Sequence, residues 1–176
     1  LLTIGGAQSF SAGGYHGTRG ADVLPIEIGP AGFEETMIST APFRARLSEV
    51  GQRHPLTSLT ADSTENARLW EGFPALEGIN LITGLRPGAT VLVEHPDPSL
   101  RLPPPNARPH PVVVVGQHGR GRVMAVLTDS MWRLGLPAAA GGGDPGRLQR
   151  FWNNGLRWLL NDPEWKRLHL RSERDE

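Results

Sequence analysis

The stretch "VVVVGQHGRGRVMAVLT" at residues 112–128 is the strongest structural signal in the sequence. It places two apolar, β-branched runs, 112–117 and 122–128, on either side of the segment "HGRG". Two such runs joined by a short glycine-containing link are typical of a β-hairpin. Neither run alternates between apolar and polar residues, so we expect both strands to be covered on both faces.

A further strand is predicted at the start of the sequence. Residues 1–4, "LLTI", form an apolar run closed by two glycines, which fits a buried parallel strand. "FRARLSEV" alternates apolar and polar residues, as a strand with one wet face does. The remaining short strands are predicted at 23–28, 43–50, 80–85 and 89–94, the last two flanking a turn at "RPG".

Helices are predicted at 63–70, with Ser63 or Thr64 as N-cap, and at 144–161. The second opens with Asp144 as N-cap and Pro145 in the first helical position. Its apolar face contains Leu148, Phe151, Trp152, Leu156 and Leu159, with Gly155 allowing close approach to the sheet. Residues 7–20 and the proline-rich segment 96–111 are predicted as loops, and 166–172 alternates like a strand. Strands interleaved with helices indicate an α/β layered domain.

Composition excludes several classes of protein. The 176 residues suit one domain with a core, and eighteen basic side chains balance eighteen acidic ones, so nucleic acid is not indicated as a partner. No apolar run reaches the length of roughly 18 residues that spans a membrane, so we expect a soluble segment. The lack of cysteine excludes disulfides, thiolate metal sites and a cysteine nucleophile. The histidines lack metal-ligand spacing, and neither a metal nor a cofactor is predicted.

Four phrases, taken together, resemble one family: "GGAQSFSAGGYHGT" (5–18), "VLPIEI" (23–28), "GQHGRGRVMAVLTDSMWR" (116–133) and "RFWNNGLRWLL" (150–160). The family is that of glutamine amidotransferase-like domains in large bacterial proteins, often next to a von Willebrand type A module and membrane helices. The resemblance covers residues 1–162 in order. It implies a flavodoxin-like sheet of the class I amidotransferase type with flanking helices.

The resemblance also implies a larger parent protein. An N-terminal strand and helix of the family lack counterparts, so the sequence is interpreted as a fragment, with 163–176 as the start of a following segment. The expected partners are other domains of the parent, including a von Willebrand type A module. The parent is expected to be anchored in a bacterial inner membrane without insertion of this segment. The oligomeric state stays open.

In catalytic relatives of this family, a strand ends in a sharp turn that presents a cysteine beside the N–H groups of an oxyanion hole. The resemblance places the turn "GGAQS" there, with Gly5, Gly6 and Ala7 where the nucleophile should stand. Glutamine hydrolysis through a thioester is therefore excluded. Ligands of open α/β sheets gather at the carboxyl ends of strands, which makes two groups ligand-binding candidates. They are Gly5, Gly6, Ala7, Gln8 and Ser9 after the first strand, and Ser130, Trp132 and Arg133 beside Asp129 after a central strand.

The leading interpretation is a non-catalytic binding or assembly module. A second is a hydrolase that uses a serine or an acid/base pair in the same crevice, with Ser9, His118 and Asp129 as candidates. The serine mechanism requires a base within hydrogen-bond reach of the hydroxyl. A third is an architectural spacer, which the absence of a pocket above "GGAQS" would favour. Structural alternatives accompany the site residues: Ser9 or Ser11 as a helix cap, Trp132 as a core residue, and the glycines as turn formers or as an anion cradle.

Overall fold

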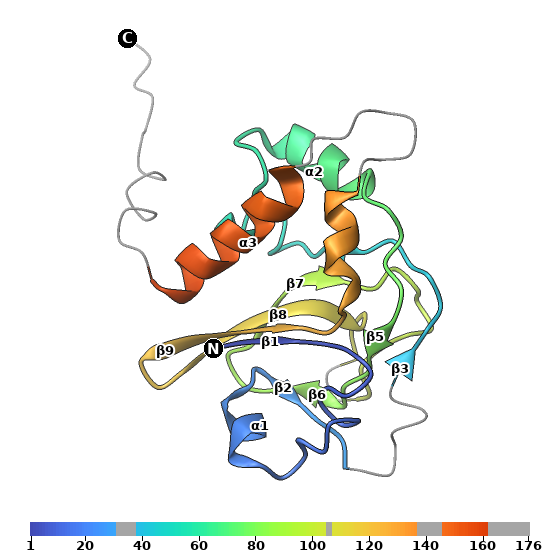
Figure 1. Ribbon diagram of the computed structural model, residues 1–176, viewed down its shortest axis with the longest axis vertical. Coiled ribbons are helices and arrows are strands. Elements are labelled where there is room, and N and C mark those ends of the chain that lie inside the picture. Colours follow the sequence, from blue (N-terminus) through green and yellow to red (C-terminus); the bar gives the residue numbers. More distant parts are fainter. Residues whose placement is uncertain (31–37, 105–106, 137–145, 162–176) are drawn as a thin grey trace.

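The computed structural model describes residues 1–30, 38–104, 107–136 and 146–161, and combines a five-stranded sheet with flanking helices (Figure 1). The elements in chain order are β1 (Leu2–Ile4), α1 (Arg19–Val23), β2 (Ile26–Glu27), β3 (Ile38–Ser39), β4 (Arg46–Leu47), η2 (Pro55–Thr57), α2 (Ser63–Glu71), β5 (Ile79–Asn80), β6 (Gly84–Leu85), β7 (Thr90–Glu94), β8 (Pro111–His118), β9 (Gly121–Val126), η3 (Ser130–Gly135) and α3 (Gly146–Leu159). The labels η2 and η3 denote short 3-10 helices. The α/β class expected from the sequence is confirmed.

The main sheet has the strand order β1-β9-β8-β7-β4. β8 and β9 form the predicted hairpin, with His118 opposite Gly121 at its closed end. β1 runs parallel to β9, and the other neighbours in this sheet are antiparallel. Two antiparallel ribbons, β2-β6 and β3-β5, complete the described strands. The carboxyl ends of β1 and β9 therefore meet at one end of the sheet.

Helices and a β-ribbon cover the two faces of the main sheet (Figure 1). Helices α2 and α3 lie on one face, and α1 with the β2-β6 ribbon lies on the other. The hairpin strands are buried from Val112 to Val115 and from Val123 to Leu127, as their unbroken apolar pattern predicts. A Cβ on Gly155 of α3 would lie 3.5 Å from the Sδ atom of Met124 in β9. Glycine at this position lets the helix approach the sheet closely, as predicted.

Three strand predictions need correction. The expected burial of β1 is wrong at Ile4, which is 44% exposed because β9 is the one described strand that pairs with β1. The strand predicted at 80–85 is divided, since Ile79–Asn80 pairs with β3 whereas Gly84–Leu85 pairs with β2. The alternating segment 43–50 keeps only the short strand β4 and an isolated bridge at Phe43.

Both predicted helices are present with altered details. The N-cap of α2 is Asp62, whose carboxylate accepts the N–H of Glu65 at 2.7 Å. In α3, Phe151 is fully buried whereas Leu156 is 51% exposed, so the buried stripe is narrower than predicted. The buried stripe consists of Phe151 and Gly155, which lie about one helical turn apart. Other predictions lie outside the described residues: the start of this helix at Asp144 and Pro145, and the strand 166–172 within the tail 163–176.

The proline-rich segment 96–111 is not purely a surface loop. Leu102 and His110 are each only 2% exposed, and a bridge between Arg101 and Pro109 closes the segment on itself. The Nε2 atom of His110 accepts the N–H of Ile82 at 3.1 Å. The segment therefore packs inward because its apolar and imidazole side chains find partners in the core.

Candidate functional site

The turn after β1 requires glycine at its first two positions. A Cβ on Gly5 would lie 2.5 Å from Oδ1 of Asn80 and 2.6 Å from the carbonyl carbon of Leu127, so no side chain fits there. Gly6 has a φ of +152°, a conformation that other L residues rarely adopt. A nucleophilic side chain cannot replace Gly5 without rebuilding this turn.

Asn80 of β5 holds the turn in place. The N–H of Gly6 donates to Oδ1 of Asn80 at 2.8 Å, and Nδ2 of Asn80 donates to the carbonyl of Gly6 at 3.0 Å. The N–H of Asn80 donates to the carbonyl of Leu127 at 2.7 Å. Asn80 is 4% exposed, so these bonds are shielded from water. The N–H of Gly6 is therefore used within the protein and is not free to stabilise an oxyanion.

A pocket of 190 Å³ lies beside this turn, where β1 and β9 end. The carboxylate of Asp129 lies near the turn, since its Oδ2 atom is 3.8 Å from the position that a Cβ on Gly6 would take. The pocket combines this one carboxylate with glycine backbone and isoleucine side chains, which suits a small ligand that donates N–H groups. The lining residues are Gly6, Ala7, Ile38, Gly78, Ile79, Asn80 and Asp129.

Two residues predicted at this end of the sheet have structural roles. Ser130 is buried, and its Oγ accepts the N–H of Glu77 at 3.0 Å and shares a hydrogen bond of 2.8 Å with the hydroxyl of Thr128. The guanidinium of Arg133 donates to the carbonyl of Ala75 at 3.0 Å and pairs with Glu77 at 2.9 Å. Both side chains bind η3 to residues 75–77, the segment that precedes β5. β5 in turn lines the pocket.

Trp132 lies on the surface, with 55% of the residue exposed, so its predicted place in the core is wrong. The reason is the 3-10 geometry of η3, in which residues three apart share a face. Met131 and Leu134 occupy the buried face, and Trp132 therefore points outward. The guanidinium of Arg133 lies 5.6 Å from the centre of the Trp132 ring.

Ser9, His118 and Asp129 do not come together in the structure. Ser9 and Asp129 both lie near the turn, since a Cβ on Gly6 would be 3.5 Å from Oγ of Ser9. His118 lies at the closed end of the hairpin, where β9 begins. The six residues of β9 separate that end from the turn by about 20 Å at roughly 3.3 Å per residue. The predicted three-residue hydrolase site is therefore not formed.

Neither Ser9 nor Ser11 caps a helix. The N-cap of α1 is Thr18, whose hydroxyl oxygen accepts the N–H of Ala21 at 3.2 Å. Ser11 is buried and donates to the carbonyl of Gly29 at 3.3 Å. The capping prediction fails because the strand runs into a series of turns, and the helix begins only at Arg19. Gln8 is exposed in these turns and is not among the pocket residues.

Two absences hold within the described ranges. No group of three or more His, Asp or Glu side chains there is placed to hold a metal ion. In the same part of the chain, no helix combines the length and the apolar character needed to cross a bilayer.

Sequence reasoning missed Asn80, Gly78 and Ile38 as parts of this site. The one available signal was Asn80 itself, because asparagine is depleted in strands and here interrupts the apolar phrase "GINLI". A buried asparagine in such a place has four hydrogen-bonding positions to satisfy. Their partners, however, lie 74 positions away in the chain.

Comparisons with known proteins show the fold alone. No family model and no curated protein matches the sequence. Among solved structures, the chain is similar to the cytoplasmic protein STM3548 from Salmonella typhimurium, with a TM-score of 0.61 and 21% identity. It is also similar to the cytoplasmic protein STM1381 from Salmonella typhimurium LT2, with a TM-score of 0.58 and 23% identity. In both cases the likeness covers 90% of this chain and 54% of the other, so the chain spans about half the length of these proteins.

Proposed function

We propose that this chain is an amidotransferase-like domain without the glutaminase reaction, and that it serves as a binding or assembly module in a larger bacterial protein. The observation that carries the proposal is the pocket of 190 Å³ beside a turn with glycine in the place of a nucleophile. The finer fold assignment, a flavodoxin-like sheet of the class I amidotransferase type, is part of the proposal. The parallel pair of β1 and β9, with its turn at the carboxyl ends, supports it.

The proposed partners are other domains of the parent protein, among them a von Willebrand type A module. The parent protein is proposed to be anchored in a bacterial inner membrane. Both statements rest on the sequence resemblance.

The chemistry of the pocket favours binding over catalysis. Asp129 offers a carboxylate to a donor, but no histidine is among the lining residues and Asn80 already uses both ends of its amide on Gly6. Among the described residues, the lining of the pocket therefore contains no histidine that could activate the hydroxyl of Ser9. The pocket itself counts against a purely architectural spacer.

The test uses L-glutamine as the probe on the purified chain. Amide chemical shifts are followed by NMR while ammonia release is measured in the same samples. We expect shift changes at Gly6, Ala7 and Gly78 without ammonia release above the blank. The variant Asp129→Asn should weaken the shift changes, whereas Glu49→Gln, at an exposed position away from the pocket, should leave them unchanged.

Each outcome separates the candidate functions. Ammonia release that depends on Ser9, tested with Ser9→Ala, would establish a hydrolase in the same pocket. Unchanged amide shifts at the turn with glutamine and with simple amines would favour the architectural spacer.

A further inference from the structure

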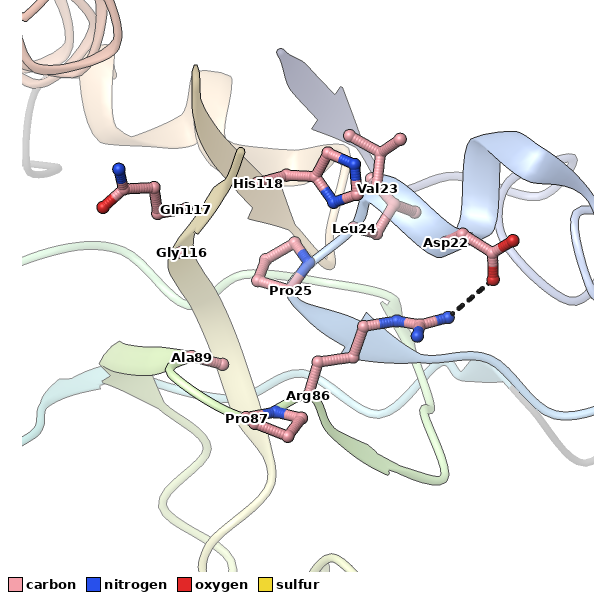
Figure 2. A pocket seen from close by; sticks show the side chains of 10 residues that line it. All are labelled: Asp22, Val23, Leu24, Pro25, Arg86, Pro87, Ala89, Gly116, Gln117 and His118. Atoms are coloured by element: carbon pink, nitrogen blue, oxygen red, sulfur yellow. Dashed lines mark hydrogen bonds and ion pairs between the residues drawn. The ribbon is translucent and has the colours of Figure 1, made fainter. Parts of the chain in front are cut away.

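A second pocket, of 290 Å³, lies by the closed end of the β8-β9 hairpin, at the other end of β9 from the glycine turn. Figure 2 shows the side chains that line it. It is bounded by the end of α1 with the start of β2, by the turn before β7, and by the last residues of β8. Its volume is close to the lower limit of about 300 Å³ for small-molecule sites. The lining residues are Asp22, Val23, Leu24, Pro25, Arg86, Pro87, Ala89, Gly116, Gln117 and His118.

One wall of this pocket is a strand edge that is not paired with any strand in the described residues. Thr90, the first residue of β7, pairs with Val115, so residues 116–118 of β8 continue with β9 on one side and no β7 residue on the other. The backbone groups on that free side are able to bond an amide, as an unpaired edge commonly does. Gly116 belongs there because a Cβ would lie 2.8 Å from Cβ of Pro25, which packs against it.

A second wall carries the guanidinium of Arg86. One of its nitrogens donates to the carboxylate of Asp22 at 3.1 Å and to the carbonyl of Ala21 at 3.4 Å. The Nε atom is buried without a hydrogen-bond partner in the described part of the chain. The backbone N–H of Arg86 donates to the carbonyl of Pro25 at 3.2 Å and fixes the base of the side chain.

The ion pair between Arg86 and Asp22 is partly exposed, so the carboxylate of a ligand is able to compete with Asp22 for the guanidinium. The side chain of Asp22 is 68% exposed and that of Arg86 is 39% exposed, so water screens their attraction. A guanidinium has five donors and binds carboxylates in a planar fork, of which this pair uses one nitrogen. A carboxylate on a ligand therefore competes with Asp22 for the same group.

We propose that this pocket binds a small amide that carries a carboxylate, such as an N-acylated amino acid. Its carboxylate would meet Arg86, its amide would bond the free edge of β8, and its apolar side chain would lie against Val23 and Pro25. Figure 2 shows His118 beside Val23 and Leu24 at the same end of the pocket. The carboxyl end of a peptide has the same chemistry, and the experiment separates the two sources.

The experiment titrates the purified chain with N-acetyl-leucine and follows amide shifts by NMR. We expect saturable changes at Ala89, Gly116 and Gln117 with a dissociation constant of about 1 mM, a typical affinity for so small a ligand. N-acetyl-leucinamide, which lacks the carboxylate, should bind about tenfold more weakly. An acetylated tetrapeptide that ends in leucine identifies the source: tighter binding than N-acetyl-leucine indicates a peptide end, and equal or weaker binding indicates a small metabolite.

Substitutions test the roles of the two charges. Arg86→Gln should weaken binding about tenfold, while Asp22→Asn should strengthen it because the competing carboxylate is removed. Arg120→Gln, on the nearby hairpin turn but outside the pocket, should leave the affinity unchanged. If Arg86→Gln fails to fold, Arg86→Lys keeps the charge, and its affinity should lie between those of Arg86→Gln and the original chain.

The proposal is overturned if the shifts at residues 89 and 116–117 do not change up to about 50 mM, well above the expected dissociation constant. Equal binding of the acid and the amide would also overturn it, as would weaker binding after Asp22→Asn. The outcome is independent of the proposed function at the glycine turn, because the probe, the variants and the reporting amides differ.

Discussion

Single residues decide what the turn after β1 can do. Gly5 is enclosed by Asn80 and by the backbone of Leu127 and Thr128. Both the N–H and the carbonyl of Gly6 form hydrogen bonds with the side chain of Asn80. A turn fixed in this way keeps its shape without a ligand. It also leaves no room for a side chain at Gly5, so glycine at this position is a structural requirement.

Gly5→Ala tests this requirement. The added Cβ would lie 2.7 Å or less from one side-chain atom and two backbone atoms, so the backbone must move. We expect a loss of about 1–3 kcal/mol in the free energy of unfolding. Urea denaturation measures it, and the matched control is Gly20→Ala in α1, where the nearest atom is 3.6 Å away. Equal effects of the two substitutions would show that Gly5 is not tightly enclosed.

At the scale of elements, α3 is the helix that joins the layers. Phe151 is fully buried and lies edge-on to Trp70 of α2, with ring centres 6.1 Å apart. Arg122 of β9 donates to the carbonyl of Trp158 at 2.6 Å, and its guanidinium lies 4.9 Å from the centre of that ring. The end of α3 therefore partly covers Arg122.

Phe151→Ala tests the contribution of this helix. Removal of a fully buried ring should cost about 3–5 kcal/mol in the free energy of unfolding. Leu156→Ala is the control on the same helix, and with its side chain half exposed we expect a change within about 0.5 kcal/mol. Chemical denaturation followed by tryptophan fluorescence measures both. A large loss of unfolding free energy in Leu156→Ala would instead support the wider buried face that the sequence predicted.

Partial or full burial lowers the pKa of three histidines in the described part of the chain, namely His54, His95 and His110. Burial lowers the pKa of His110 from 6.5 to about 4; the carbonyl of Pro111 opposes this shift and His95 adds to it. Burial, with a smaller effect from Arg122, lowers the pKa of His54 to about 4 as well. The pKa of His95 is also lowered by burial, with Asp97 acting in the opposite direction. Protonation of His110 at Nε2 would remove the acceptor for the N–H of Ile82.

This burial predicts a loss of stability in mild acid. The unfolded chain binds protons on His54 and His110 below about pH 6.5, whereas the folded chain does so only near pH 4. The stabilisation from these two neutral rings is therefore fully present above pH 6.5 and is lost as the pH falls toward 4. We expect His110 to account for a loss of about 3 kcal/mol between these limits. Denaturation curves at several pH values measure the slope. His110→Gln should flatten it, and an unchanged slope in that variant would contradict the assignment.

The sequence by itself determined the β8-β9 hairpin, the helices α2 and α3, the α/β class and the absence of a cysteine nucleophile. Each of these depends on residue types or on residues within a few positions of one another, so short-range pattern is sufficient. Only the tertiary structure decided that Asn80 clamps Gly6 from 74 positions away, that β1 is an exposed edge, and that His118 lies far from Ser9. These facts depend on which distant strands pair and in which direction, and the free energy of that pairing comes from the assembled core.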